Sequence, residues 1–156
     1  MSVETARAWL ATNAPDIEII EAHDSTATVL EAAATLGVEP GRIAKTLAIR
    51  VQGEVLLLVT RGDARLDNAK TKAAFGGRPR MLGPDETLEL TGHPVGGVCP
   101  FGVATNLPIY LDVSLKTFDE VFPAAGSRTS SVRVKPQRLA EAVRGRWTDV
   151  CTLPDG

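Results

Sequence analysis

The chain of 156 residues is 44% hydrophobic and 23% charged, with a formal net charge of −2, and this composition excludes a disordered or fibrous protein and a protein that coats nucleic acid. It is long enough to bury a core without disulfides, so we expect residues 1–156 to form one domain. No stretch approaches the roughly 20 apolar residues that span a bilayer, and no signal peptide is apparent, so we expect a cytoplasmic protein without membrane contact.

Apolar spacing predicts two helices near the N-terminus, with a short strand between them. The first helix covers 2–13 and the strand covers 17–21. Asp24 or Ser25 can cap the second helix, which ends at Gly37.

Two strands, 44–51 and 54–60, follow as a β-hairpin joined by Gln52 and Gly53. The second strand is apolar on both faces, which is typical of a central strand. The hairpin should therefore form the centre of the sheet.

Lys45 is the unusual residue of this hairpin. At the two-residue period of a strand, it shares a face with Ile43, Leu47, Ile49 and Val51. An ammonium among aliphatic side chains is desolvated unless an anion, carbonyl groups or a ligand compensates it. Lys45 is therefore a candidate for ligand binding.

The second half alternates irregularly between helices and strands, which predicts a mixed α/β sheet surrounded by helices. The predicted elements are a helix over 66–75, a strand over 78–82, a helix over 84–91, a strand over 108–112, a short helix over 115–122, an extended segment over 130–134 and a last helix that begins at Pro136.

A loop rich in glycine and proline, residues 91–102, connects two of these elements. Glycines allow a backbone to approach a ligand closely, and prolines stiffen a loop, so its N–H groups can hold an oxyanion or a carbonyl oxygen. The loop has neither a Walker motif nor GxGxxG. A plain connection between elements is the competing interpretation.

Several other residues allow both a functional and a structural role. His93 can be a base or a structural hydrogen-bonding group, and Cys99 can be a nucleophile or a small packed side chain. Asp112 can line a site at a strand end or cap the next helix. Residues 124–131 can close a narrow pocket or form a turn.

The spacing of His23, His93, Cys99 and Cys151 does not resemble a zinc site, and two thiols are too few for a disulfide framework. We expect reduced cysteines, no metal and no cofactor.

Basic residues are concentrated in two segments. Residues 42–80 carry nine Lys and Arg, and residues 128–146 carry six, whereas residues 1–41 carry one. If the two basic segments share a face, that face can hold a short phosphate backbone. An ordinary solvated surface is the alternative.

Together these stretches resemble the YbaK/ProX family of aminoacyl-tRNA deacylases, which is related to the editing domain of bacterial prolyl-tRNA synthetases. The resemblance runs from about residue 20 to residue 144. It rests on the strand lysine in "GRIAKTLAIRV", the loop "GHPVGGVCPFG" with Gly96 and Pro100 as the family's GxxxP, the segment "YLDVSLKTFDEVFPAAGS" and "SVRV" before the last helix.

The resemblance implies a partly barrel-like sheet and hydrolysis of the ester in a mischarged tRNA held by its CCA end. The tRNA would be tRNA-Pro carrying alanine, cysteine, serine or 2-aminobutyrate, and prolyl-tRNA synthetase would be a further partner. The protein would be a monomer or a homodimer. By resemblance, Lys45, Gly96 and Gly97 carry the reaction, and the substrate is bound by His93, Val98, Cys99, Pro100, Phe101, Gly102, Asp112, Gly126, Ser127 and Ser131.

Two departures leave the amino acid open. Cys99 stands where the family often has serine, and Ser131 lies near a position that is acidic in the cysteine-specific branch. Two other functions also stay open, namely a non-catalytic module that binds aminoacyl-tRNA or a synthetase, and a thiol enzyme that uses Cys99.

Overall fold

The computed structural model describes residues 2–154. The helices in this range are α1 (Ser2–Asn13), α2 (Val29–Leu36), α3 (Asn68–Phe75), α4 (Pro84–Thr91) and α5 (Pro136–Val143), with 3-10 segments η1 (Pro40–Arg42) and η2 (Val113–Thr117). The strands are β1 (Ile19–Glu21), β2 (Ile43–Val51), β3 (Glu54–Arg61), β4 (Arg65–Leu66), β5 (Arg80–Met81), β6 (Ile109–Asp112), β7 (Phe122–Pro123), β8 (Ser130–Val132), β9 (Arg146–Thr148) and β10 (Cys151–Thr152).

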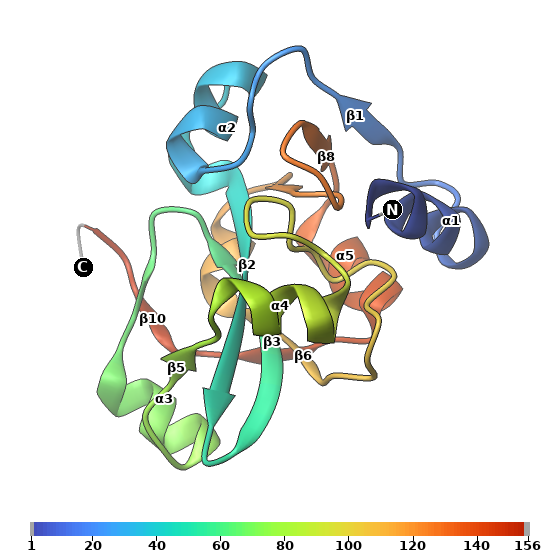
Figure 1. Cartoon of the computed structure of the whole chain (residues 1–156). Helices are drawn as coiled ribbons and strands as arrows, with labels where there is room; N and C mark the ends of the chain where they lie inside the picture. The colour runs from blue at the N-terminus through green and yellow to red at the C-terminus, as the bar shows by residue number, and fades with distance from the viewer. Residues whose placement is uncertain (1, 155–156) are drawn as a thin grey trace.

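The main sheet runs in the order β5-β2-β3-β6-β9, and β7 pairs with β2 (Figure 1). β2 is antiparallel to β3 and β5, whereas β7 is parallel to β2 and β6 is parallel to both β3 and β9. The mixed α/β sheet predicted from sequence is confirmed. Its strand order is an open path, so the sheet does not close into a barrel.

The β2–β3 hairpin forms as predicted, because Gln52 and Gly53 both adopt positive φ, at 50° and 81°. Two such residues make a turn whose twist matches that of the strands. β3 then lies between β2 and β6, and residues Leu57, Leu58 and Val59 have no exposed surface. The prediction of a central second strand is therefore confirmed.

Each face of the sheet packs on its own cluster of apolar side chains. Ala44 and Val59 face the larger cluster with α1 and α5, and Leu111 of β6 joins them. Ile49 and Leu58 face a smaller cluster that contains Ala64, Val150 and Cys151. Because β2 contributes alternate residues to both clusters, its backbone position is fixed from two sides.

Two local predictions are wrong. The cap of α2 is Thr28, whose hydroxyl accepts a hydrogen bond from the N–H of Glu31, rather than Asp24 or Ser25. The predicted helix over 115–122 is the 3-10 segment η2 followed by β7, because Phe122 pairs with Ile43 at the edge of β2. The strands β4, β9 and β10 were not predicted, since strands this short carry little periodic signal.

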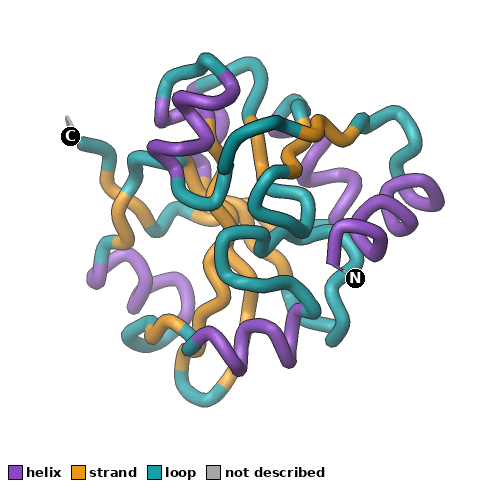
Figure 2. The backbone as a smooth tube through the Cα atoms, turned by 45° about the horizontal axis from the view of Figure 1, so that its top comes forward, coloured by secondary structure: helices purple, strands orange, loops and turns teal. Residues whose placement is uncertain are grey.

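The tube view shows how loops surround the sheet (Figure 2). The loop after α4, yellow in Figure 1, lies between α4 and α2, and α1 and β10 lie on opposite sides of the molecule in that view. None of the helices in residues 2–154 has the length and apolar character needed to cross a membrane.

Candidate functional site

A cavity of about 380 Å³ opens between α2, β2, α4 and the loop after α4. This volume lies at the lower end of small-molecule sites. Its lining includes Thr26, Ala27, Thr28, Val29 and Ala32 from the α2 region, Ile43–Ala48 from β2, Met81, Leu82, Pro84 and Thr87 from the α4 region, Val95, Gly96 and Val98 from the loop, and Phe122, Ala124 and Ser131. Of the sequence-predicted residues, the cavity wall therefore includes Lys45, Gly96, Val98 and Ser131.

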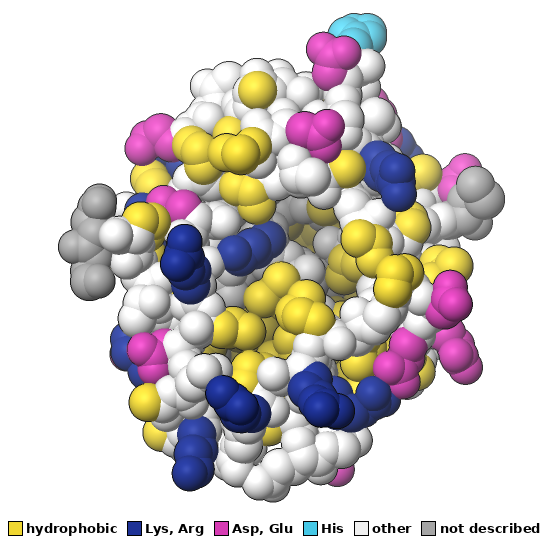
Figure 3. All heavy atoms as spheres, turned by 60° about the vertical axis from the view of Figure 1, so that its left-hand side comes forward, with side chains coloured by type: hydrophobic (Ala, Val, Ile, Leu, Met, Phe, Trp, Pro, Cys, Tyr) yellow, Lys and Arg dark blue, Asp and Glu magenta, His cyan; other side chains and the backbone are white. Residues whose placement is uncertain are grey.

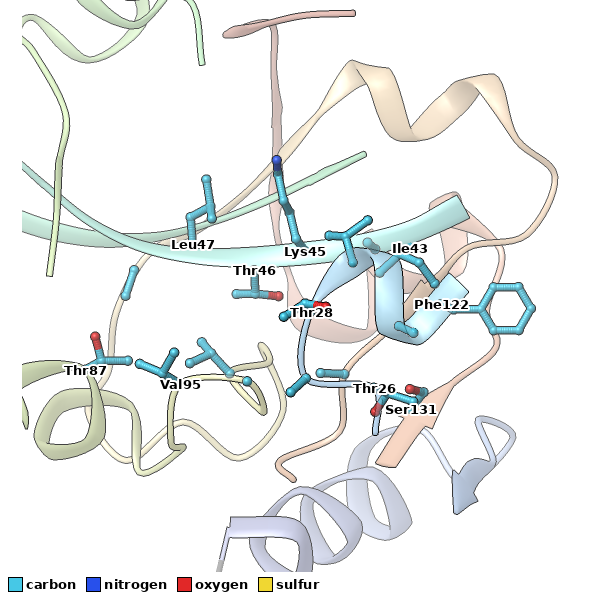
Figure 4. Close-up of a pocket in the computed structure, with 18 of the residues that line it drawn as sticks. Thr26, Thr28, Ile43, Lys45, Thr46, Leu47, Thr87, Val95, Phe122 and Ser131 are labelled. Carbon is cyan, nitrogen blue, oxygen red and sulfur yellow. The ribbon is translucent and has the colours of Figure 1, made fainter. Parts of the chain in front are cut away.

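Strand β2 contributes side chains from both of its faces to this cavity. In Figure 4, Lys45 and Leu47 project from one face of the strand, whereas Thr46 projects from the other, toward Thr28 and Val95. The alternation is the ordinary pleat of a strand. The cavity therefore wraps around the edge of β2, with Lys45 on one side and the glycine-rich loop on the other.

The ammonium of Lys45 is anchored by a backbone carbonyl. Its Nζ donates a hydrogen bond of 2.7 Å to the oxygen of Ala64, and no carboxylate among the described residues forms an ion pair with it. Burial lowers the pKa of Lys45, and electrostatic interactions with Cys151 and Asp63 partly offset this decrease. A half-buried cation with only one acceptor can still bind an anion or a polarised oxygen.

The loop contacts the cavity through Gly96, whose φ of 94° requires glycine. The N–H of Gly97 donates to the carbonyl of Pro94 at 2.9 Å, and the carbonyl of Gly97 accepts from the N–H of Gly126 at 3.0 Å. Gly97 thus holds the loop against the turn before β8. No described residue accepts a hydrogen bond from the N–H groups of Gly96 and Val98, so these two are available to a ligand.

His93 and Cys99 lie in the core beneath the loop, and both are fully buried. His93 Nε2 lies 2.8 Å from the carbonyl oxygen of Phe101, so this nitrogen must donate, and Nδ1 accepts from the hydroxyl of Ser2. Burial lowers the pKa of His93 and raises the pKa of the Cys99 thiol to about 12. A protonated thiol beside an occupied imidazole is not an activated nucleophile.

The remaining sequence-predicted residues do not line the cavity. Phe101 is buried in the main core, and Pro100 lines a separate hollow of about 800 Å³ with Trp9. Gly102 packs on the backbone of Thr5.

Asp112 caps η2, the structural role considered for it. One carboxylate oxygen accepts from the N–H of Ser114 at 2.9 Å and the other from the N–H of Val150 at 2.8 Å. Gly126 packs against the backbone of Ser2, and the hydroxyl of Ser127 is hydrogen-bonded to that of Ser130 at 2.6 Å. These groups support the turn and strand behind the cavity.

Lys and Arg side chains surround an apolar hollow in the space-filling view (Figure 3). Lys45 from the first basic segment lines the cavity, and Arg128 from the second is exposed and packs against Gly96. Other basic residues pair with carboxylates, as Arg50 does with Glu86 at 2.6 Å and Arg138 with Asp16 at 2.7 Å. The two basic segments therefore meet at the cavity, while part of their charge is neutralised elsewhere.

Threonine hydroxyls at the cavity were missed by sequence reasoning. Thr46 projects into it from β2, beside Thr28, the N-cap of α2 (Figure 4), and Thr26 and Thr87 also line it. Thr46 lies directly after the lysine, but its orientation depends on which strands pair with β2, which no local pattern reveals. Among residues 2–154, no group of three or more His, Cys, Asp and Glu side chains is arranged to hold a metal ion.

Comparison with known proteins gives matches over most of the chain. Residues 23–142 match the model of the family described as "Aminoacyl-tRNA editing domain". The chain is 47% identical to "Uncharacterized protein YwhH" of Bacillus subtilis, over 97% of this chain and 98% of the relative. It is 29% identical to "Putative Cys-tRNA(Pro)/Cys-tRNA(Cys) deacylase EbsC" of Enterococcus faecalis, over 85% of this chain and 80% of the relative.

A solved structure has the same fold along nearly the whole chain. The "Crystal structure of a putative trans-editing enzyme for prolyl tRNA synthetase" superimposes with a TM-score of 0.88 at 34% identity, covering 97% of each chain. The similarity therefore includes α1 and the strands after α5, which lie outside the family match.

Proposed function

The chain belongs to the family of aminoacyl-tRNA editing domains, and we propose that residues 1–156 act as one cytoplasmic trans-editing deacylase. It hydrolyses the ester between a small amino acid and the terminal adenosine of a mischarged tRNA. The tRNA is tRNA-Pro, and prolyl-tRNA synthetase is the partner whose errors it corrects. The names of the similar deacylase and of the similar trans-editing enzyme support this proposal.

One observation carries the proposal. On one side of β2 the cavity has a half-buried ammonium without a carboxylate partner among residues 2–154, and on the other a glycine-rich loop in which the N–H groups of Gly96 and Val98 bond to no described residue. The end of an aminoacyl-tRNA carries a phosphate, which a cation can bind, and an ester carbonyl, whose oxygen N–H groups can stabilise. In this arrangement Lys45 binds the phosphate or the ester oxygen, and the N–H groups of Gly96 and Val98 stabilise the oxyanion.

The cavity wall holds no Asp, Glu, His or Cys among the described residues. The attack by water therefore depends on the free hydroxyl of the terminal ribose and on positioning. Positioning alone can contribute roughly 7 to 11 kcal/mol in favourable cases. The proton of the attacking water passes to the ribose oxygen that leaves, so the reaction needs no side-chain base.

The size of the cavity favours a small amino acid. Its apolar wall includes the short and branched side chains of Ala48, Leu82 and Val98 besides Met81 and Phe122. A cavity of about 380 Å³ between them suits alanine, serine, cysteine or 2-aminobutyrate. A methylene group changes binding by only about 1 to 3 kcal/mol. We therefore expect activity toward several small amino acids.

A panel of tRNA-Pro charged with alanine, serine, cysteine, 2-aminobutyrate or proline tests the proposal. Wild-type protein is expected to release the small amino acids and to leave proline attached. Lys45→Ala should slow release by roughly 10- to 100-fold, the loss expected when a hydrogen bond from a charged group to the phosphate or the ester oxygen is removed. Lys72→Ala, a lysine change on the exposed surface of α3, is the matched control and should keep full activity.

A second candidate function is a module that binds aminoacyl-tRNA without chemistry, and the lack of acids and bases on the described cavity wall favours it. Saturable tRNA binding with ester loss at the spontaneous rate would support this candidate against deacylation. Unchanged activity in a folded Lys45→Ala protein would instead refute the role of the lysine.

A further inference from the structure

The outer edge of β2 has a gap in its hydrogen-bonded partners. β7 pairs with Ile43 and Ala44, and β5 pairs with Ile49 and Arg50. Between these two short strands, no described strand pairs with the outer edge of residues 45–48. This edge faces the cavity, because all four residues line it.

The backbone of Thr46 faces this gap. The carbonyl of Ala48 accepts a hydrogen bond from the N–H of Leu82 at 3.1 Å, so the backbone groups of Ala48 point to the outer edge. Groups two residues apart in a strand point the same way. The N–H and C=O of Thr46 therefore point into the cavity, and neither has a hydrogen bond to a described residue on that side.

The side chain of Thr46 is also without a partner. Its Oγ1 is the single buried side-chain nitrogen or oxygen in residues 2–154 that makes no hydrogen bond, and it projects into the cavity on the side of Thr28 and Val95 (Figure 4). A buried hydroxyl without a partner costs about 1 to 3 kcal/mol. Such groups are rare in native proteins, and a ligand in the cavity can supply the missing partner.

We propose that Thr46 binds the aminoacyl group itself: its C=O and Oγ1 accept hydrogen bonds from the α-ammonium, and its N–H donates to the ester carbonyl. This assignment rests on the proposed function. The aminoacyl residue then takes the place of the missing strand residue, in the pattern of a hydrogen-bonded antiparallel pair, where two residues exchange both N–H···O bonds.

The charges around the gap agree with this orientation. Lys45 is the single charged side chain among the described residues of the cavity wall, and its ammonium lies on the opposite face of β2, bonded to Ala64. Strand β2 therefore separates the Lys45 ammonium from an α-ammonium bound beside Thr46, and this separation reduces the repulsion between the two cations. Lys45 remains free to contact the phosphate side of the adenosine.

Binding of non-hydrolysable amides tests the proposal without chemistry. The probes are 3′-alanylamino-3′-deoxyadenosine and its propionyl counterpart, which lacks the α-ammonium, measured by calorimetry. Wild-type protein should bind the alanyl probe about tenfold more tightly than the propionyl probe, as expected for hydrogen bonds to a charged group. Thr46→Val should weaken the alanyl probe about fivefold and the propionyl probe less than twofold, and Thr46→Ser, which keeps the hydroxyl, should resemble wild type.

Thermal unfolding separates binding from a structural role. Thr46→Val replaces an unpartnered hydroxyl with a methyl group and should keep or raise Tm, whereas a structural hydroxyl would lower it. Equal weakening of both probes by Thr46→Val, equal affinity of wild type for both, or no measurable binding of the alanyl probe would each overturn the proposal. The expected binding pattern in a protein that hydrolyses no aminoacyl-tRNA would keep the Thr46 subsite and refute the proposed deacylation.

Discussion

Substitution of Gly97 by alanine tests how the glycine-rich loop is held at the cavity. A Cβ on Gly97 would lie 2.7 Å from the nitrogen of Ser127, 2.8 Å from the carbonyl carbon of Gly126 and 2.9 Å from the Cα of Ser127. All three atoms belong to the backbone, so no side chain can rotate away. The loop must therefore separate from the turn before β8.

The size of the effect follows from these distances. Ordinary contact begins at 3.4 Å, so the loop must move by about 0.7 Å, and the 3.0 Å hydrogen bond from Gly126 to Gly97 is stretched. Overpacking typically costs about 1 to 3 kcal/mol, and the hydrogen bond adds about 0.5 to 1.5 kcal/mol. We expect a loss of about 1.5 to 4.5 kcal/mol in unfolding free energy, together with weaker deacylation because Gly96 and Val98 are displaced.

Urea unfolding followed by circular dichroism measures this loss, with ester release measured on the same preparations. Gly83→Ala is the matched control, because a Cβ at Gly83 meets no atom within 4 Å and its φ is −70°. A Gly97→Ala protein as stable as the Gly83→Ala protein, within about 0.5 kcal/mol, would refute the close contact between the loop and the turn.

Three further predictions concern residues around the site. Burial lowers the pKa of His93, so below the ordinary value of about 6.5 the unfolded chain binds a proton that the folded chain does not. The unfolding free energy should therefore fall between pH 7 and pH 5, by at most about 1.4 kcal/mol per pH unit from this group, and His93→Gln should flatten that slope. Cys99→Ser should retain deacylase activity within about twofold, because a thiol whose pKa is about 12 is not a nucleophile at neutral pH; a loss of activity in folded protein would revive the thiol mechanism. Asp112→Asn should lower unfolding free energy by about 1 to 3 kcal/mol, because an amide offers one acceptor oxygen to the two N–H groups of Ser114 and Val150, and a chemical denaturation curve that superimposes on wild type would contradict this.

Local patterns in the sequence determined the larger elements. The turn at Gln52 and Gly53 and the continuous apolar run of β3 were sufficient to predict the central hairpin, because both features act between near neighbours along the chain. The position of Lys45 on a largely apolar strand face was also readable, since a strand has a fixed period of two residues. The glycine- and proline-rich loop could be recognised as a candidate ligand-binding loop, although its packing partners could not.

The tertiary structure alone decided which residues line the cavity. His93 and Cys99 are near Gly96 in sequence but lie in the core, whereas Thr28 and Ser131 are far apart in sequence and line one cavity. The open edge at Thr46 exists because β5 and β7 pair with the two ends of β2 and leave its middle free. Which backbone groups stay unpaired is a property of long-range strand pairing, and two- or three-residue strands carry too little periodic signal to reveal that pairing in advance.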